Sequence, residues 1–167
     1  MYLQKLRFIS LITLVAALSG VAVLNLPLAF TVSRVLAQTV DGRKIEADRL
    51  LQQGIDQFNI SQFETALQSW QQALVIYREI KDRKGEGWAL GNIGGAYLSL
   101  GDYTKAIDYS EQWLAIAREI KDRSSEGKAL GNLGVTYKSL GDYTKAIDYK
   151  EQVLAIAREI KDRNSEG

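Results

Sequence analysis

The feature that most constrains this sequence is a long near-repeat at a fixed spacing. Residues 91–127 align without a gap to residues 131–167, and 30 of the 37 positions carry the same residue 40 positions apart. A fixed period of roughly 20–50 residues is typical of proteins that stack one small structural unit many times. Since each unit buries its apolar face mainly against its neighbours, we expect a solenoid whose surface serves to contact a partner.

The apolar residues of the repeat predict two helices in each unit, because they recur three and four positions apart. These positions are Leu90, Ile93, Gly94 and Tyr97 in the first helix of the second unit and Ala106, Ile107, Trp113, Leu114, Ala117 and Ile120 in the second helix. Gly101 is placed to end the first helix, and Asp102 is placed to cap the start of the second. Gly94 and Ala106 are small enough to let the two helices pack closely.

A weaker copy of the unit lies upstream and brings the number of helix pairs to three. The sequence Arg-Glu-Ile-Lys-Asp-Arg at 78–83 returns at 118–123 and 158–163. In the first copy, Ser61 and Glu64 form a Ser-x-x-Glu capping box ahead of the second helix. We therefore expect an all-α array of three antiparallel helix pairs, which is close to the minimum for a stable stack. Its units cover about 45–84, 85–124 and 125–167, and a linker at 38–44 precedes them.

The composition excludes several classes of chemistry. There is no histidine and no cysteine among the 167 residues, which excludes Ser-His-Asp and Cys-His catalysis, thiolate and imidazole metal ligands, and disulfides. The 21 basic and 20 acidic residues give a net charge of +1, which argues against a nucleic-acid partner because such proteins carry a clear basic excess. We therefore expect a protein that is not an enzyme, with no cofactor and no metal.

The first 37 residues form a candidate export segment. Lys5 and Arg7 precede an apolar run over Phe8–Leu24, and Val35 and Ala37 provide small residues three and one positions before a possible cleavage ahead of Gln38. The alternative is an uncleaved membrane anchor within residues 8–30, since roughly 17–25 apolar residues can span a bilayer. Positive charge ahead of such a segment keeps the start of the chain in the cytoplasm. Both interpretations therefore place the repeats outside it, either periplasmic or secreted, or membrane-anchored and facing outward.

The pattern L-x-x-(I/L)-G-x-x-Y-x-x-x-G-x-Y-x-x-A begins at Leu90 and again at Leu130, and it resembles the tetratricopeptide repeat family. The resemblance covers roughly residues 45–167 and is weaker in the first unit, where Gln57 replaces the tyrosine. The 40-residue spacing is similar to the longer-helix subtype of kinesin light chains and of many cyanobacterial proteins, in which such arrays often precede a caspase-like CHAT domain. The resemblance implies a right-handed superhelical solenoid that binds a peptide segment of another protein.

In this family the first helices of successive units line a concave groove. The matching positions are Asp48, Leu51, Gln52, Ile55 and Phe58 in the first unit, Trp88, Gly91, Asn92, Gly95 and Leu98 in the second, and Lys128, Gly131, Asn132, Val135 and Lys138 in the third. The candidate peptide-binding residues among them are Gln52, Trp88, Asn92, Leu98, Lys128, Asn132 and Lys138. The amides of Gln52, Asn92 and Asn132 form a ladder that can pair with the main chain of an extended peptide. The alternative is that Asn92 and Asn132 match only because the duplication is recent. Trp70, Trp88 and Trp113 are candidates for an aromatic binding strip, but Trp70 and Trp113 fall on core faces, so we interpret these two as packing residues.

Two further signals have structural explanations. The segment Gly91–Gly95 follows no strand and lacks the Gly-Lys-Ser/Thr ending of a phosphate loop, so close packing explains its glycines. The carboxylates of Asp102, Asp108 and Glu111 have no evident apolar pocket to shift their pKa values, so we interpret them as capping or solvated groups.

The last unit leaves its second helix without a successor on the face that carries Val153 and Ala157. Three interpretations are open at this point. The chain is an exported adaptor that binds a peptide; or it is the regulatory part of a longer protein, for example a CHAT-type peptidase; or it assembles through end-to-end self-association, in which a second copy covers that face.

Overall fold

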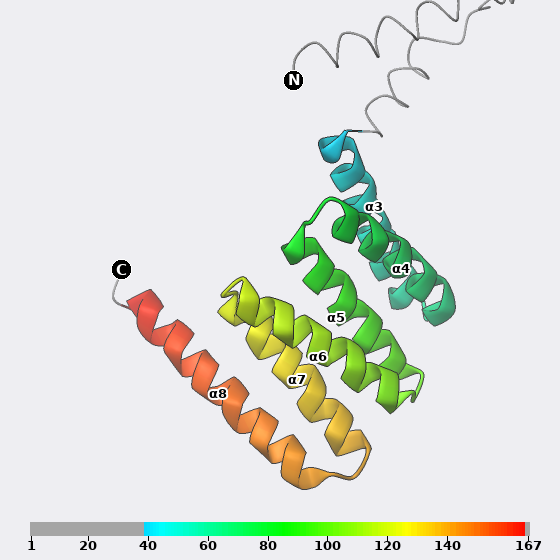
Figure 1. Ribbon diagram of the computed structural model, residues 1–167. Helices are drawn as coiled ribbons and strands as arrows, with labels where there is room; N and C mark the ends of the chain where they lie inside the picture. Colours follow the sequence, from blue (N-terminus) through cyan, green and yellow to red (C-terminus); the bar gives the residue numbers. More distant parts are fainter. Residues whose placement is uncertain (1–38, 166–167) are drawn as a thin grey trace, which may run out of the picture. The chain divides into compact units, whose positions relative to one another are not determined.

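The computed structural model describes residues 39–165 and places the side chains of residues 39–161. Six helices and no strand run through this part of the chain (Figure 1). They are α3 (Val40–Asn59), α4 (Phe63–Glu79), α5 (Arg83–Ser99), α6 (Tyr103–Glu119), α7 (Arg123–Ser139) and α8 (Tyr143–Ser165). The prediction of an all-α fold with three helix pairs is confirmed. The expected signal or anchor segment at 1–37 lies outside the described residues, and none of the six helices is long and apolar enough to cross a membrane.

The helices form a two-layered array in chain order (Figure 1). Each helix packs against the next one along the chain, and in addition α3 contacts α5 and α5 contacts α7. The second helices of the pairs, α4, α6 and α8, make no such contacts with one another. The array therefore bends toward the first helices, whose layer forms the concave side, and α3 and α8 form its two ends.

The turns inside the units explain where the first helices stop. Gly101 (φ 77°) and Gly141 (φ 83°) adopt the left-handed conformation just after α5 and α7, which glycine can do without a steric penalty. Asp102 then caps α6 by accepting a hydrogen bond from the backbone N–H of Lys105 at 3.2 Å. The predicted roles of Gly101 and Asp102 are therefore confirmed.

The first unit departs from two expectations. Ser61 occupies the place of Gly101 and adopts φ 62°, and α4 begins after Gln62, whose side chain makes no capping hydrogen bond. The predicted capping box of Ser61 and Glu64 is therefore wrong, because Ser61 is the left-handed turn residue and the cap is the residue after it. Furthermore, α3 begins at Val40 with Thr39 as its N-cap, so most of the expected linker at 38–44 is helical.

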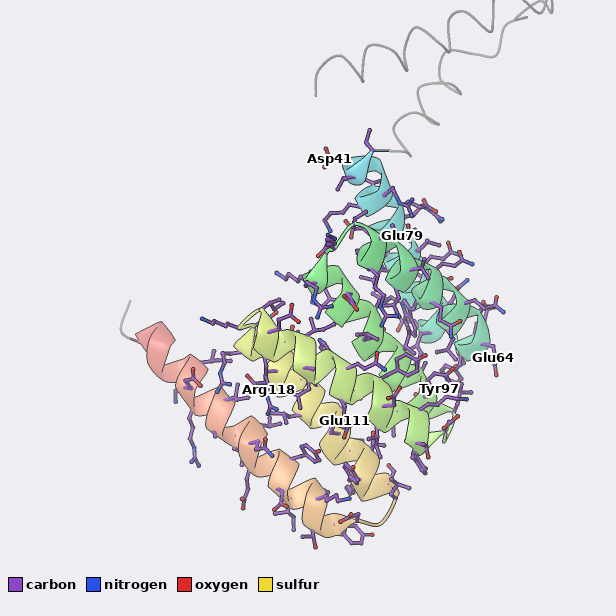
Figure 2. The ribbon with its side chains drawn as sticks, viewed as in Figure 1. Asp41, Glu64, Glu79, Tyr97, Glu111 and Arg118 are labelled. Atoms are coloured by element: carbon purple, nitrogen blue, oxygen red, sulfur yellow. The ribbon has the colours of Figure 1, made fainter. Side chains whose placement is uncertain are left out.

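The two helices of the second unit approach each other closely at Gly94. A β-carbon at this position would lie 3.0 Å from the Ser110 hydroxyl oxygen and 3.4 Å from the Ala106 carbonyl oxygen. Next to this contact the rings of Tyr97 and Tyr109 stack, with their centroids 5.5 Å apart (Tyr97 is labelled in Figure 2). The small residues at these positions thus set the spacing of the helix pair, as the sequence predicts.

Successive units are joined by an ion pair that repeats along the array. Arg78 Nε donates to Glu86 Oε1 at 2.9 Å, and Arg118 (labelled in Figure 2) donates in the same way to Glu126 at 2.9 Å. Both glutamates are 6% exposed, and each also pairs with the arginine three residues before it. Two arginines thus compensate each buried carboxylate, as the burial of a charge requires.

A second contact accompanies each of these ion pairs. At the first junction Gly85 lies directly against Tyr77, so that a β-carbon on Gly85 would be 2.3 Å from the ring. At the second junction the equivalent residues are Ser125 and Ala117, which are 6% and 1% exposed. The first junction thus pairs a large residue with a glycine, and the second junction has two small residues at the equivalent positions. The order in which the helices pack is the same at both.

The end of α8 differs from the ends of α4 and α6. The latter stop at Glu79 and Glu119, and Lys81 and Lys121 then adopt φ values of 59° and 57°. The identical sequence at 158–163 remains helical, and α8 continues to Ser165. In the first two units a following helix packs against this region, whereas within residues 39–165 no helix follows α8.

Candidate peptide-binding groove

A cavity of about 570 Å³ opens on the concave side of the array. Its walls come from α3, α5 and α7. Trp70 of α4 and Trp113 of α6 form its floor. The lining residues are Leu51, Ile55, Phe58, Trp70, Trp88, Gly91, Asn92, Gly95, Trp113, Lys128 and Asn132. The volume falls within the range of roughly 300–1,000 Å³ that is usual for ligand sites.

The floor of the groove is aromatic. Trp70 is 2% exposed, donates its indole N–H to the Leu51 carbonyl oxygen at 3.0 Å, and lies 5.8 Å from the ring of Phe58. Trp113 packs against Gly91, where a β-carbon would lie 2.6 Å from the indole ring. The absence of a side chain on Gly91 therefore gives Trp113 the space in which it reaches the groove. Such a floor favours the burial of apolar ligand groups.

Two side-chain amides line the groove above this floor, Asn92 on α5 and Asn132 on α7. Both residues are half-buried, and within residues 39–161 neither side-chain amide has a hydrogen-bond partner. Each amide offers two donors and an acceptor. Because these groups are already partly shielded from water, hydrogen bonds to a ligand would lose less in desolvation than those of a fully exposed amide.

Trp88 and Lys128 occupy equivalent positions of α5 and α7 at the rim of the groove. Trp88 is 40% exposed, and the Lys84 ammonium lies 5.1 Å from the centroid of its ring, a cation–π distance. Lys128 is exposed and forms no ion pair with any side chain of residues 39–161. Lys84, by contrast, already faces a carboxylate, because the pKa of Asp122 is lowered mainly by the backbone N–H of Ser125 and also by the charge of Lys84. Lys128 is therefore the positive charge at this end of the groove that can pair with a ligand carboxylate.

Three of the predicted site residues lie elsewhere. Gln52 is exposed, and its amide donates to Asp56 of the same helix at 2.9 Å. Leu98 is half-buried and does not line the groove, and Lys138 lines a separate cavity of about 520 Å³ between α7 and α8. The structure therefore brings together Trp88, Asn92, Lys128 and Asn132, and the predicted amide ladder has two members at this site. Peptide contact by any of the seven residues remains a prediction.

Asp48, which we expected on the groove face, belongs to a polar cluster that joins α3 to α4 and α5. Its carboxylate accepts hydrogen bonds from the Tyr77 hydroxyl at 2.7 Å and from Lys44 at 3.1 Å, and Lys44 also donates to Asp82 at 2.9 Å. Burial, together with the hydrogen bond to Asp48, raises the pKa of Tyr77 above its usual range. The hydrogen bond to Asp82 is the main cause that raises the pKa of Lys44. The cluster therefore holds α3, which forms one wall of the groove, against α4 and the start of α5.

The carboxylates considered for catalysis have the surroundings of structural groups. Asp102 caps α6, Asp108 accepts a hydrogen bond from the Gln112 amide at 2.9 Å, and Glu111 is exposed. The part of the chain that the structure describes contains no group of three acidic, histidine or cysteine side chains that could hold a metal ion.

Trp70 and Trp113 are the groove residues that the sequence analysis assigned to packing. Both are buried as expected, but both also form the floor of the groove. They stand 43 residues apart, so an alignment at the 40-residue period does not bring them together. The glycine opposite each indole, Gly54 for Trp70 and Gly91 for Trp113, is the sequence signal that could have located them.

Comparison with known proteins places this groove in a family. The family model described as tetratricopeptide repeat matches residues 46–119 and 87–159. A search among curated proteins gave no match. Among solved structures, the TPR domain of Arabidopsis FLU is similar, with a TM-score of 0.67 and 26% identity over 70% of this chain and 98% of that one.

Two further structures share the fold at lower identity. Aspartyl phosphate phosphatase F from Bacillus subtilis gives a TM-score of 0.69 at 22% identity, over 74% of this chain and 32% of that chain. BtubC (BKLC) from P. vanneervenii gives a TM-score of 0.64 at 22% identity, over 69% of this chain and 48% of that chain. This chain thus spans less than half of either protein, and the two likenesses show the fold alone. Since the family model matches most of the sequence, the chain belongs to the tetratricopeptide repeat family.

Proposed function

We propose that this chain is an adaptor that binds a peptide segment of another protein in the groove between α3, α5 and α7. Tetratricopeptide repeats commonly mediate protein–protein interaction. The observation that carries the proposal is the combination of two unpartnered amides, Asn92 and Asn132, with an aromatic floor in one cavity of about 570 Å³. The amides can pair with a peptide main chain of any sequence, while the floor accepts apolar side chains.

The groove favours a segment that carries a large apolar side chain close to a carboxylate. The apolar group would lie on the indoles of Trp70 and Trp113, which form the floor. The carboxylate would lie near the ammonium group of Lys128 at the rim. Burial of the apolar group would supply most of the affinity, and the charges would set the direction in which the peptide lies.

The test uses the full chain and a library of short random peptides, from which bound peptides are recovered and measured singly by titration calorimetry. Replacement of Asn92 and Asn132 by alanine removes two to four hydrogen bonds and should weaken binding about tenfold or more. Asn59→Ala is the matched control, because this exposed asparagine ends α3 outside the groove. If the paired variant binds as tightly as the Asn59→Ala variant while both keep their circular dichroism, the groove is not the binding site.

We also propose that the repeats operate outside the cytoplasm, because residues 1–37 combine basic residues, an apolar run and a cleavage-like site. Cell fractionation followed by N-terminal sequencing tests this proposal. A product that starts at Gln38 supports export with cleavage, and an intact chain in the membrane fraction supports an anchor. An intact chain in the cytosol contradicts both.

A further inference from the structure

The two ends of the array carry the two halves of the ion pair that joins its units. The internal pairs, Arg78 with Glu86 and Arg118 with Glu126, repeat at 40 residues. The next arginine in this series is Arg158 on α8, which has no ion-pair partner within residues 39–161. At the other end, Glu46 on α3 precedes Glu86 by 40 residues, so it stands where a glutamate would face such an arginine.

Glu46 shares one feature with the internal glutamates, an ion pair with an arginine of its own helix, although this arginine follows Glu46 in sequence and the glutamate is only partly buried in the single chain. Glu86 pairs with Arg83 of its own helix and with Arg78 of the preceding unit. Glu46 pairs with Arg49 of its own helix at 2.7 Å, and its place for an arginine of a preceding unit is empty within the described chain. The carboxylate is therefore already set beside one guanidinium and has acceptor capacity for a second.

The contact beside the ion pair has complementary sizes at the two ends. At the second junction, Ser125 and Ala117 stand at the positions equivalent to Gly85 and Tyr77. By the same 40-residue step, the two ends present Ile45 on α3 and Ala157 on α8. Ile45 is 70% exposed, and Ala157 is exposed as well. The large Ile45 of one copy can pack against the small Ala157 of another. At the first junction the sizes are reversed, because the second helix carries the large residue, Tyr77, and the first helix of the next unit carries the small one, Gly85.

The outer face of α8 carries apolar residues at the positions where α6 carries apolar residues that α7 covers. Leu114, which α7 helps to cover, is 8% exposed, whereas its equivalent Leu154 is 47% exposed. Tyr143 and Ile147 on α8 are 64% and 57% exposed. These large apolar side chains form one continuous patch at intervals of four to seven residues along the helix. An exposed patch of this kind marks an interaction site.

The sequence differences between α6 and α8 also suit α3 as the covering helix. Ser110, which is 1% exposed in α6, is replaced by Lys150, whose ammonium has no carboxylate partner within the described side chains. In the antiparallel register set by Tyr77 with Gly85, position 150 lies opposite Gln52 of α3, and Asp56 is one turn further along. The Asp56 carboxylate is a charged acceptor for Lys150 that α5 and α7 do not supply, since Ala96 and Thr136 stand at the equivalent positions.

We infer that a second copy of this chain docks its α3 onto the outer face of α8 and continues the stack of helix pairs. The contact joins two different surfaces, so each added copy leaves the same two ends free and the assembly grows in a line. The cavity of about 520 Å³ beside Lys138 and Val135 then lies at the junction of two copies. This inference does not depend on the proposed peptide binding, because it uses the ends of the array and not the groove.

The competing occupant of the α8 face is the last segment of the chain itself. Residues 163–167 repeat residues 123–127 with one difference, so they could begin another helix of the same kind. Glu166 would then take the role that we assign to Glu46 of a second copy. In the structure α8 continues to Ser165, and the turn that would bring this segment back onto α8 is not formed.

The absence of cysteine allows a direct test in the full chain by engineered disulfides. A variant with Ile45→Cys and Ala157→Cys has one thiol at each end of the array, so a bond between them joins two copies. Mild oxidation with copper phenanthroline should convert it into a ladder of dimers, trimers and longer species on a denaturing gel. The matched control combines Ile45→Cys with Ala155→Cys, since Ala155 is also exposed but its equivalent Ala115 stays exposed in the stacked unit. No ladder, or an equal ladder in the control, overturns the inference.

Charge exchange provides the second arm of the test. Arg158→Glu should reduce the rate of ladder formation at least tenfold, Glu46→Arg should do the same, and the two changes together should restore it, because they re-form the pair in the opposite sense. Glu166→Gln should have no effect. Failure of the double variant to recover, in protein whose circular dichroism is unchanged, contradicts the register. An increase in the ladder caused by Glu166→Gln shows that the chain's own end occupies the face in competition with a second copy, and also contradicts the inference. Peptide binding in the groove would be unaffected by any of these results.

Discussion

Gly91 and Gly131 occupy the same position in successive units, yet their surroundings predict opposite responses to alanine. A β-carbon at Gly91 would lie 2.6–2.9 Å from three atoms of the Trp113 ring, whereas a β-carbon at Gly131 would meet no atom within 4 Å. The difference arises because Val153 stands where the second unit has Trp113. The third unit is therefore an internal control for the second.

The size of the two effects follows from helix propensity and packing. Alanine is favoured over glycine in a helix interior by about 1 kcal/mol. Gly131→Ala should stabilise the fold by about this amount, which corresponds to a rise in melting temperature of roughly 3–6 °C for an array of this length. At Gly91 the same gain is opposed by overpacking against a buried indole, which costs about 1–3 kcal/mol. Gly91→Ala should therefore be neutral to destabilising by about 2 kcal/mol.

Thermal and urea unfolding followed by circular dichroism measures both variants. The decisive comparison repeats Gly91→Ala in a Trp113→Val background, which gives the second unit the valine of the third. There the alanine should become stabilising by about 1 kcal/mol, so the double-mutant cycle should show a coupling of about 1–3 kcal/mol. If Gly91→Ala stabilises the wild-type protein as much as Gly131→Ala does, or if its effect is independent of Trp113, the packing argument is refuted.

Three further perturbations test other parts of the fold. Gly94→Leu should lower the melting temperature sharply, because the added side chain meets the Ser110 hydroxyl 3.0 Å from the β-carbon position, and an unchanged melting curve would contradict this contact. Lys121→Gly should raise the free energy of unfolding by about 1 kcal/mol in urea titrations, because Lys121 holds φ 57° and glycine adopts this conformation without the steric cost of a side chain. The pKa of Asp82 is lowered because backbone and Lys44 hydrogen bonds outweigh its burial, and the pKa of Asp122 is lowered mainly by the backbone N–H of Ser125. Since the folded state then binds fewer protons than the unfolded state, stability should fall as pH drops below about 4, and replacing both aspartates by asparagine should flatten melting temperature against pH in that range.

The fold could be predicted from the sequence because its determinants are local and repeated. The apolar spacing gives the helices, Gly101 and Asp102 give the turn, and the 40-residue period gives the stacking order. In the first unit the prediction of the turn was wrong, because a serine stands where the other two units have glycine. Ser61 is a good N-cap by type, but the chain path requires a left-handed residue at that place, so it ends one helix and does not begin the next.

The groove could be predicted only in part, because a residue can be buried in the core and still line the groove. The spacing of apolar residues correctly marks Trp70 and Trp113 as buried, but it does not reveal that a glycine on the facing helix gives each indole the space in which it reaches the groove. Gln52 shows the converse limit. It aligns with Asn92 and Asn132, but α3 is the end helix of the array within residues 39–165, and its side-chain amide donates to Asp56 of the same helix. Such contacts depend on which helices are neighbours in space.

The buried glutamates between units are a further case that alignment alone does not explain. Glu86 and Glu126 look like ordinary polar residues of a helix start, yet each is 6% exposed and is held by two guanidinium groups. Their burial ties the order of the units to charge, because an array shifted by one helix would leave the carboxylate without its arginine.

All three tryptophans of the chain, Trp70, Trp88 and Trp113, line the same groove. The tryptophan fluorescence of the protein, excited at wavelengths that tyrosine does not absorb, therefore reports on this one surface. A ligand that displaces water from the groove should shift the emission to shorter wavelength, whereas events at the far faces of α4 or α8 should leave the spectrum unchanged. The groove thus carries its own optical probe, which allows occupancy to be followed without a label and before any partner has been identified.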